Sequence, residues 1–301
     1  MSTKNNHPRN QHYVPQFILR NFRSREGDFV WCYDKTNKKV FETNISNIAS
    51  ESYFYDWIKG NPEHSLESKL SEIESETALI ISKILKDNTL STINLGEKQK
   101  LSHFISIQLL RTKNQLEKLK DFQDVLKGFL QMPIDTDLPE ENLQITFLSM
   151  LTEAENFIPI LMDKFWYLLN SEKPFLISDN PVVFQNIYNQ SQTRGTLGLK
   201  SKGIEIYFPL SKNIVLCLFC RDVYDKIKYH ASDDSTINDF LSQLNSEVPV
   251  NCNSGNIENI NSLQVLSSER FIFSSSNDFW LVEDMLKINP ELKDGPRLGY
   301  D

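Results

Sequence analysis

The sequence has few glycines, few cysteines and no long hydrophobic run. Its 301 residues include only 10 Gly, and neither of the glycine-rich phosphate-binding motifs, G-x-x-x-x-G-K-[ST] and G-x-G-x-x-G, occurs. The motifs H-E-x-x-H and G-x-S-x-G are absent as well. These absences argue against P-loop nucleotide hydrolysis, Rossmann redox chemistry and zincin proteolysis. We therefore expect no nucleotide or redox cofactor.

Four cysteines are too few for a disulfide scaffold in a chain of this length. Cys217 and Cys220 form a C-x-x-C pair, which also suits a zinc or redox site. The surrounding run, Ile214–Cys220, is typical of a buried strand, in which residues i and i+3 point to opposite faces. We therefore expect both thiols to be core residues.

The same run is the longest strongly apolar segment, about a third of the ~20 residues that a membrane helix needs. Residues 1–13 hold no apolar segment of the kind found in secretion signals. These two observations predict a soluble, cytoplasmic protein with no membrane partner.

Charge is unevenly distributed along the chain. The 40 acidic and 32 basic residues give a net charge of −8, yet residues 1–25 contain five basic residues and no acidic one. An acidic chain is not expected to be coated in nucleic-acid-binding charge. Any contact with a polyanion must therefore be local.

Hydrophobic residues make up 40% of the chain, which is enough for a packed core. Periodicity and turn residues in the first half predict, in order, a flexible basic arm at 1–11, a short helix at 15–22, a hairpin at 29–43, a helix at 65–86, a helix at 96–128, a loop at 132–141 and a helix at 141–161 that ends or bends near Pro159.

The second half is richer in strands. The pattern there predicts a hairpin at 165–178, a mobile polar insertion at 185–203, strands at 204–208, 214–219 and 270–273, and helices at 235–247, 255–268 and 278–287. Because helices and strands cluster separately, the predicted class is α+β. A helical central region (about 60–162) would pack beside a mainly antiparallel β-sheet (about 163–290) in one domain over 12–301.

Gln11–Phe17 is the most distinctive polar stretch. Pro15 restricts Val14 to an extended conformation, so that His12 and Tyr13 approach the short helix in a fixed direction. Gln16 and Arg20 are i and i+4 and share one face of that helix. An imidazole, an amide and a guanidinium at one patch suit phosphate binding or acid–base chemistry. Structural hydrogen bonds that clamp the N-terminal segment are the alternative.

Two further polar pairs lie on the long predicted helices. Glu67 and Glu74 are seven residues apart and flank the apolar stripe of their helix, where they suit a metal ion, acid–base catalysis, or pairing with Arg20 or Arg111. Gln108 and Arg111 share a side of the next helix within an apolar surface, which predicts a buried polar network.

Ser178-Asp179-Asn180-Pro181 follows a predicted strand. Loops at strand ends often hold functional side chains on a rigid support. Asp and Asn also bond their own backbone in ordinary turns, so a purely structural role is equally open.

Five motifs in order resemble the domain-of-unknown-function 4238 family of mainly bacterial proteins. They are Gln11–Phe22, the Glu67…Glu74 helix after Tyr53-Phe54-Tyr55, Gln108-x-x-Arg111-Thr112, Ser178-Asp179-Asn180-Pro181, and Phe208-Pro209-Leu210-Ser211. The late Asn261…Arg270-Phe271 segment fits the family as well, although Ser268 stands where Ala is commoner. The resemblance spans about 11–275.

The resemblance supplies no reaction, but it implies that these polar residues form one set. The basic N-terminal segment, the cations His12, Arg20 and Arg111 suited to a phosphate, and the nearby carboxylates lead us to hypothesise a phosphodiester hydrolase. It would be a nuclease of a bacterial phage-defence or toxin system, with nucleic acid as its partner. Its expected catalytic residues are His12, Gln16, Arg20, Gln108, Arg111 and Asp179; its expected substrate-binding residues are Tyr13, Ser178 and Asn180; and its expected Mg²⁺ ligands are Glu67 and Glu74, with Asp179 as a further candidate.

Two alternatives stay open. In one, the protein is a non-catalytic sensor whose polar set binds a small anionic ligand or connects the two halves of the fold. In the other, it is a structural partner in a larger complex, which would need an exposed apolar patch.

Overall fold

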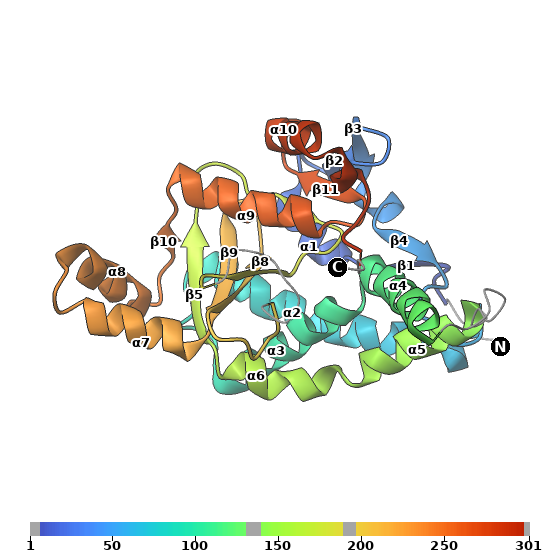
Figure 1. Cartoon of the computed structure of the whole chain (residues 1–301), viewed down its shortest axis with the longest axis horizontal. Helices are drawn as coiled ribbons and strands as arrows, with labels where there is room; N and C mark the ends of the chain where they lie inside the picture. The colour runs from blue at the N-terminus through green and yellow to red at the C-terminus, as the bar shows by residue number, and fades with distance from the viewer. Residues whose placement is uncertain (1–6, 131–139, 189–196, 298–301) are drawn as a thin grey trace.

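Two β-sheets and several layers of helices make up the computed structural model, which describes residues 7–130, 140–188 and 197–297 (Figure 1). Among these residues, five strands form one sheet in the order β10-β5-β9-β8-β7 and four form another in the order β3-β2-β11-β6. The pair β1-β4 stands apart. The strands are β1 (Asn10–His12), β2 (Phe29–Asp34), β3 (Lys39–Asn44), β4 (Ser50–Ser52), β5 (Phe165–Asn170), β6 (Ile177–Ser178), β7 (Val183–Asn186), β8 (Ile204–Pro209), β9 (Ile214–Phe219), β10 (Val250–Asn251) and β11 (Phe271–Ser274).

Helices cover the sheets from below in Figure 1, where α2, α3, α5 and α6 lie, while α7 and α8 project to one side. The α-helices are α1 (Gln16–Leu19), α2 (Glu67–Asp87), α3 (Leu95–Leu110), α4 (Lys113–Leu130), α5 (Glu140–Thr152), α6 (Ile158–Met162), α7 (Arg221–His230), α8 (Ser235–Asn245), α9 (Ser254–Ser267) and α10 (Trp280–Ile288). The predicted α+β class is confirmed, with antiparallel pairing throughout both large sheets except for the parallel pair β10-β5.

The helices α2 and α3 run antiparallel and form the support for the N-terminal segment. Their ion pairs show the alignment, because Lys83 binds Glu97 and Lys100 binds Glu76. Local sequence sets the ends: α2 stops at Asn88, whose φ of 52° lies in the left-handed region that Asn tolerates. A capping box of Asn94 and Glu97 begins α3.

The predicted helix at 96–128 is wrong as one element, because the chain breaks between α3 and α4 at Arg111 and Thr112. The carbonyl of Arg111 accepts a hydrogen bond from the Tyr55 hydroxyl at 3.0 Å. Its guanidinium is drawn inward at the same point. Tertiary partners thus override a helical pattern that is continuous in the sequence.

The predicted hairpin at 165–178 is also wrong. β5 pairs with β9 and β10, whereas β6 pairs with β11 in the other sheet. The intervening segment follows the β8–β9 turn, since the amides of Ser171 and Phe175 donate to the carbonyls of Asn213 and Lys212. Residues close in sequence therefore belong to different sheets.

Several other predicted elements are confirmed, and some boundaries shift. The hairpin at 29–43 and the strands at 204–208 and 214–219 form β2-β3 and β8-β9, and the three late helices form α8, α9 and α10. The helix α7 was not predicted. The bend near Pro159 lies earlier, between α5 and α6, because Pro159 occupies the first turn of α6. The predicted loop at 132–141 lies almost wholly outside the described residues, and so does the middle of the polar insertion at 185–203 (residues 189–196), whose start is β7.

The N-terminal arm predicted at 1–11 is ordered in its described part. β1 pairs with β4, and the His7 ring lies 2.9 Å from the Asp56 carboxylate. Basic residues farther along are already neutralised, because Arg20 pairs with Asp28 and Arg25 with Glu42. Residues 1–6 lie outside the described part of the chain.

One hydrophobic cluster extends from Tyr13 to Phe273 and includes residues of both large sheets. Cys217 is buried in β9 and Cys220 follows that strand, so both thiols lie in the core, as predicted. Burial raises the pKa of each thiol, which keeps it protonated and unreactive.

Within the described ranges, no single helix has the length and apolar character to cross a membrane. The bent pair Asn142–Thr152 and Ala154–Met162 meets those two criteria only when counted together.

Candidate functional site

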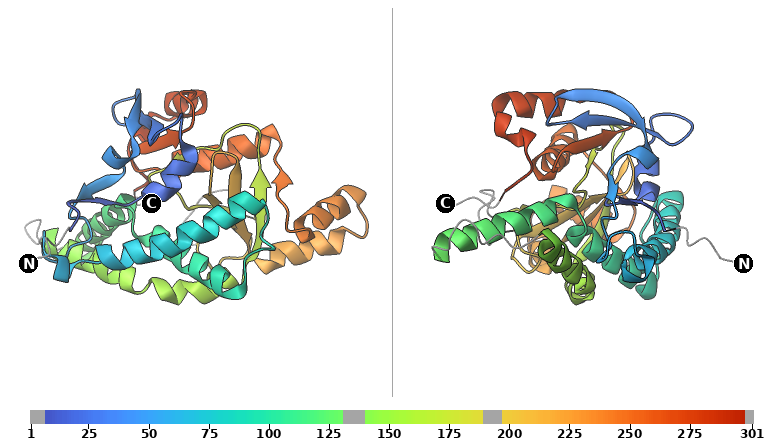
Figure 2. Two further views of the ribbon diagram at one scale, coloured as in Figure 1. Left: turned by 180° about the vertical axis from the view of Figure 1, so that it is seen from behind. Right: turned by 90° about the vertical axis from the view of Figure 1, so that its right-hand side faces the viewer.

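The helices α1 and α2 are in contact and lie side by side (Figure 2, left). A polar cavity of about 280 Å³ lies between them. Residues from both helices and from the end of β1 line it: His12, Gln16, Phe17, Arg20, Glu67, Ser71, Glu74, Ser75 and Ala78. Five predicted site residues, His12, Gln16, Arg20, Glu67 and Glu74, thus meet at one opening.

The short helix α1 contributes the Gln16 amide to the cavity, and Arg20, which directly follows α1, contributes a guanidinium. Arg20 donates to the Gln16 carbonyl oxygen at 3.0 Å, which places the two side chains on one face as their i, i+4 spacing predicts. Arg20 also pairs with Asp28 at 3.0 Å. The Gln16 amide nitrogen lies 3.5 Å from the His12 ring.

His12 is held in its neutral form. Burial lowers the pKa of its imidazole, and the positive charges of Arg111 and Arg20 lower it further, against backbone contacts with Ile45 and Ser46 that raise it. At neutral pH the ring therefore has a nitrogen free to accept a proton.

The surroundings of Glu67 shift its pKa in the opposite direction, upward. Its Oε2 atom is buried and has no hydrogen-bond partner among the described residues. Burial raises the pKa of Glu67 to about 7, and the charge of Glu74 adds to this effect although Arg111 opposes it. A large fraction of Glu67 is therefore protonated at neutral pH.

Arg111 supports the cavity from behind instead of lining it. Its side chain is 2% exposed and donates from Nη1 to Glu74 at 2.6 Å, from Nη2 to the His12 carbonyl at 2.6 Å and from Nε to the Tyr55 hydroxyl at 3.1 Å. Burial alone would lower the pKa of Arg111, but Tyr55 and Glu74 outweigh it and raise that pKa. The predicted pairing of Glu74 with Arg111 is confirmed, whereas direct substrate contact by Arg111 is not supported.

Gln108 and Tyr13 also lie behind the cavity. Gln108 is fully buried and donates from Nε2 to the Tyr13 carbonyl at 2.8 Å. Tyr13 is 3% exposed and packs edge-on against Phe54. Neither side chain lines the opening, so the structure does not support their predicted contact with a substrate. Instead, their hydrogen bond positions the segment that carries His12.

The Ser178–Asn180 loop lies in the four-stranded sheet region, away from this opening. The Asp179 carboxylate accepts backbone hydrogen bonds from Glu269, Arg270 and Phe271, each 2.7 Å long. Ser178 Oγ donates to Gln264 at 2.8 Å, and Asn180 Nδ2 donates to the carbonyl of Ser267 at 3.1 Å.

All three loop residues are buried, and none lines the cavity. The structure therefore gives them the alternative, structural role: they fasten β6 to β11 and α9. The predicted catalytic and substrate-binding roles of this loop have no support in its geometry.

Glu67 and Glu74 are not accompanied, among the described residues, by the further ligands that a metal ion needs. The described residues contain no group of three or more His, Cys, Asp or Glu side chains placed to share an ion. Glu74 is already bound by Arg111. The described residues therefore do not fit the Mg²⁺ site that we expected.

Sequence reasoning overlooked four residues around the cavity. Ser71 and Ser75 line it, and they could have been found because Ser71 is four residues after Glu67 and Ser75 four residues after Ser71. Tyr55 orders Arg111, and Asp56 accepts hydrogen bonds from Gln11 and His7. No periodicity marks these last two, because they lie in an irregular connection.

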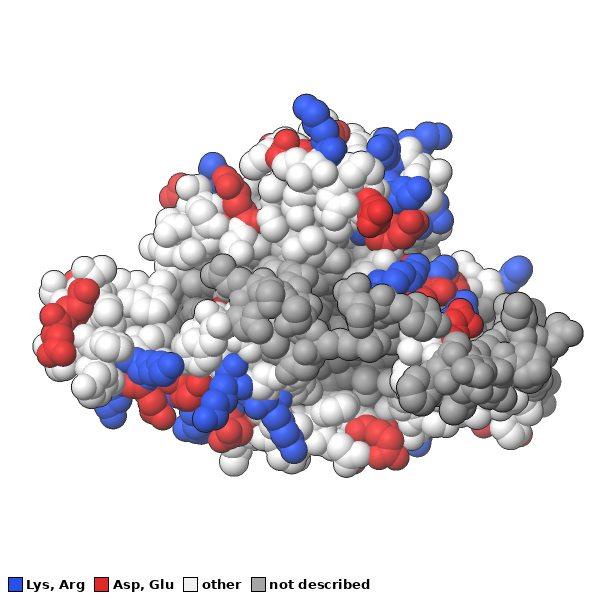
Figure 3. Space-filling model, viewed as in Figure 1, with Lys and Arg blue, Asp and Glu red and all other residues white. Residues whose placement is uncertain are grey.

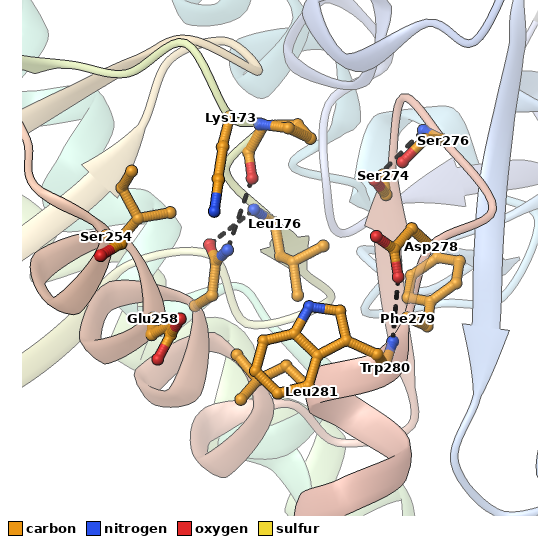
Figure 4. Close-up of a pocket in the computed structure, with 13 residues that line it drawn as sticks. Lys173, Leu176, Ser254, Glu258, Ser274, Ser276, Asp278, Phe279, Trp280 and Leu281 are labelled. Atoms are coloured by element: carbon orange, nitrogen blue, oxygen red, sulfur yellow. Dashed lines mark hydrogen bonds between the residues drawn. The ribbon is translucent and has the colours of Figure 1, made fainter.

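A second cavity of about 280 Å³ opens near the start of α9 and the start of α10 (Figure 4). Lys173, Glu258 and Trp280 lie around it, and Asp278 accepts a hydrogen bond from the amide of Trp280. No histidine occurs among the described residues that line it. It therefore lacks the paired acid and base of the α1–α2 cavity.

Fold and site together define an α+β protein with a polar cavity, lined by His12 and Glu67 among others, between its N-terminal segment and α2. The chain belongs to the DUF4238 family, whose model is described as a protein of unknown function and matches residues 10–278. Comparison with curated proteins and with solved structures found no match.

The hydrogen bonds of Asp179 predict a large loss of stability in Asp179→Ala. Three buried N–H groups would lose their acceptor, which costs about 3–5 kcal/mol of unfolding free energy. Asp163→Ala is the control, since its exposed pair with Arg221 contributes about 0–1 kcal/mol. Urea unfolding measures the stability of both variants. Equal losses of unfolding free energy in Asp179→Ala and Asp163→Ala would contradict the structural role of Asp179.

The raised pKa of Glu67 predicts a pH-dependent advantage for Glu67→Gln. As pH rises from 4.5 to about 7, the unfolded wild type ionises before the folded one, so its stability falls while the uncharged variant is unaffected. We expect the variant to gain on the order of 1–2 kcal/mol over this range, allowing for partial exposure. Unfolding curves at several pH values measure this, with Glu72→Gln as the exposed control on α2. A difference in unfolding free energy between Glu67→Gln and the wild type that does not grow with pH would contradict this prediction.

Proposed function

We propose that this protein is a phosphodiester hydrolase, acting as a nuclease, with the α1–α2 cavity as its active site. The observation that carries the proposal is that His12 and Glu67 line the same cavity. Their environments shift the two pKa values in opposite directions, so that a neutral base and a protonated acid coexist at neutral pH.

In this mechanism His12 is the general base and Glu67 the general acid. His12 takes a proton from the attacking hydroxyl or water as its oxygen bonds to phosphorus. Glu67 gives its proton to the leaving oxygen as the phosphorus–oxygen bond breaks. Solvent then returns His12 to its neutral form and Glu67 to its acid form. Loss of either group costs about 10²–10⁴-fold in rate in general acid–base catalysis.

Arg20 is the cation suited to the phosphate. Its Nε atom pairs with Asp28, but the side chain is 42% exposed and lines the cavity, so a substrate oxygen can reach the N–H groups that Asp28 does not bind. Gln16 and the hydroxyls of Ser71 and Ser75 offer further hydrogen bonds. Arg111 and Gln108 act as positioning residues, since both bind carbonyls of the segment that carries His12.

The surface charge favours a local contact with the substrate. On the face drawn in Figure 3, behind which α1 and α2 lie, the described basic side chains lie beside acidic ones. At the cavity itself, Arg20 pairs with Asp28. A short or single-stranded stretch of nucleic acid fits this pattern better than a duplex bound along its length. We place the activity in the cytoplasm, in a bacterial phage-defence or toxin system, because the substrate is found there.

The burial of Arg111 and Gln108 favours a second candidate, a sensor whose cavity binds a small anion without reaction. The two candidates differ in what His12 and Glu67 do. In a sensor, their loss changes ligand affinity or melting temperature and no bond cleavage is ever observed.

The test incubates the purified chain with end-labelled RNA and DNA pools, with and without Mg²⁺. We expect cleavage of at least one pool, and a fall of about 10²–10⁴-fold in its rate in both His12→Gln and Glu67→Gln. Glu72→Gln is the matched control, because it removes an exposed carboxylate from the same helix. Melting temperatures measured in parallel separate lost catalysis from lost folding.

Two outcomes would overturn the proposal. One is the absence of cleavage in every pool. The other is cleavage that persists unchanged in Glu67→Gln and His12→Gln while both variants remain folded, since a contaminating nuclease would then be responsible.

A further inference from the structure

A third cavity, of about 290 Å³, lies at the opposite end of α3 from the candidate active site. It is lined by Leu90, Ile93, Lys98, Lys164, Phe165, Trp166, Arg221, Leu244, Asn245 and Glu247. Lys98 and Arg111 are 13 residues apart, which a helical rise of 1.5 Å per residue converts to roughly 20 Å along α3. No residue lines both this cavity and the α1–α2 cavity. This cavity is therefore independent of the one assigned to the nuclease.

Lys164 is the most unusual residue of the lining. It is 6% exposed, and within the described ranges its ammonium group makes no hydrogen bond and no ion pair. Lysine is almost never this deeply buried unless it is paired. The ammonium nitrogen is not among the fully buried atoms of the described residues that lack a partner, so it is open to the cavity and accessible to an anion there.

Two more cations converge on the same space. The Lys98 ammonium lies 4.9 Å above the Trp166 ring and, among the described residues, has no carboxylate within 4.0 Å. Arg221 begins α7 and binds both the carbonyl and the carboxylate of Asp163. Among the lining residues, Glu247 is the one acid that faces these three basic groups.

The pKa values of Lys98 and Lys164 are both lowered, which shows that their surroundings disfavour the charged form. Burial lowers the pKa of Lys98, and the charge of Arg221 lowers it further while Glu247 opposes this. Burial also lowers the pKa of Lys164, although Cys220, Asp163 and Asp222 partly compensate. Both cations would be stabilised by an anion placed between them.

The rest of the lining is apolar and partly flat. Trp166 is fixed by a hydrogen bond from its indole nitrogen to the carbonyl of Leu161 at 2.9 Å. Leu90, Ile93 and Phe165 add apolar surface beside it. A ligand that carries both an anionic group and a flat apolar part would use both halves of the cavity.

We propose that this cavity is a binding site for a small organic anion, a phosphate monoester or carboxylate on a flat apolar group. Lys98 and Lys164 hold the anionic group and Arg221 borders it. Trp166 and the neighbouring apolar side chains cover the remainder. This site does not rest on the nuclease proposal and is tested separately.

The experiment titrates the full chain with phenyl phosphate, benzoate and inorganic phosphate by calorimetry. We expect phenyl phosphate or benzoate to bind more tightly than inorganic phosphate, because each adds contact with the apolar wall. The stronger of the two identifies the anionic group. Lys98→Gln and Lys164→Met should each weaken that binding by about tenfold or more, as loss of a charge-assisted hydrogen bond does.

Lys100→Gln is the matched control, since Lys100 lies on the same helix and pairs with Glu76 outside this cavity. Without ligand, Lys164→Met should melt at a higher temperature than the wild type, because an unpartnered buried charge is removed. Binding of none of the three probes would overturn the proposal. So would binding that Lys164→Met leaves unchanged in a folded variant.

Discussion

The buried guanidinium of Arg111 is the interaction on which the rest of the site depends. A charge removed from water must be paired and hydrogen-bonded, or the fold loses several kcal/mol. Arg111 meets this requirement with Glu74 from α2, Tyr55 from the connection after β4, and the carbonyl of His12. Three segments distant in sequence are thereby held at one point, and the helical run from α3 to α4 is interrupted there.

This arrangement also determines the chemistry of the cavity. Because Arg111 binds Glu74, Glu67 on the same helix is left without a hydrogen-bond partner for its buried oxygen among the described residues. Burial lowers the pKa of the nearby His12 ring, and the positive charge of Arg111 lowers it further. The proposed acid and base therefore both border the cavity that this ion pair supports.

The polar motifs of the family divide between a cavity and its support. Thr112 donates to Asn180 at 3.3 Å, so the residues that follow Arg111 reach the Ser178–Asn180 loop and, through it, β11 and α9. The loop fastens sheet to helix, while His12, Gln16, Arg20 and Glu67 border the opening. Residues that share a family pattern therefore serve two physical purposes.

The sequence by itself determined the α+β class, the helix α2, the β2-β3 hairpin, the inert cysteines and five residues of the cavity, because these depend on periodicity and spacing within one segment. Tertiary structure alone decided that Arg111 breaks a continuous helical pattern, that β5 and β6 enter different sheets, and that Gln108 and Asp179 are sealed from the cavity. These outcomes depend on partners far away in the chain. Burial, and with it every shifted pKa, arises only when those partners exclude water.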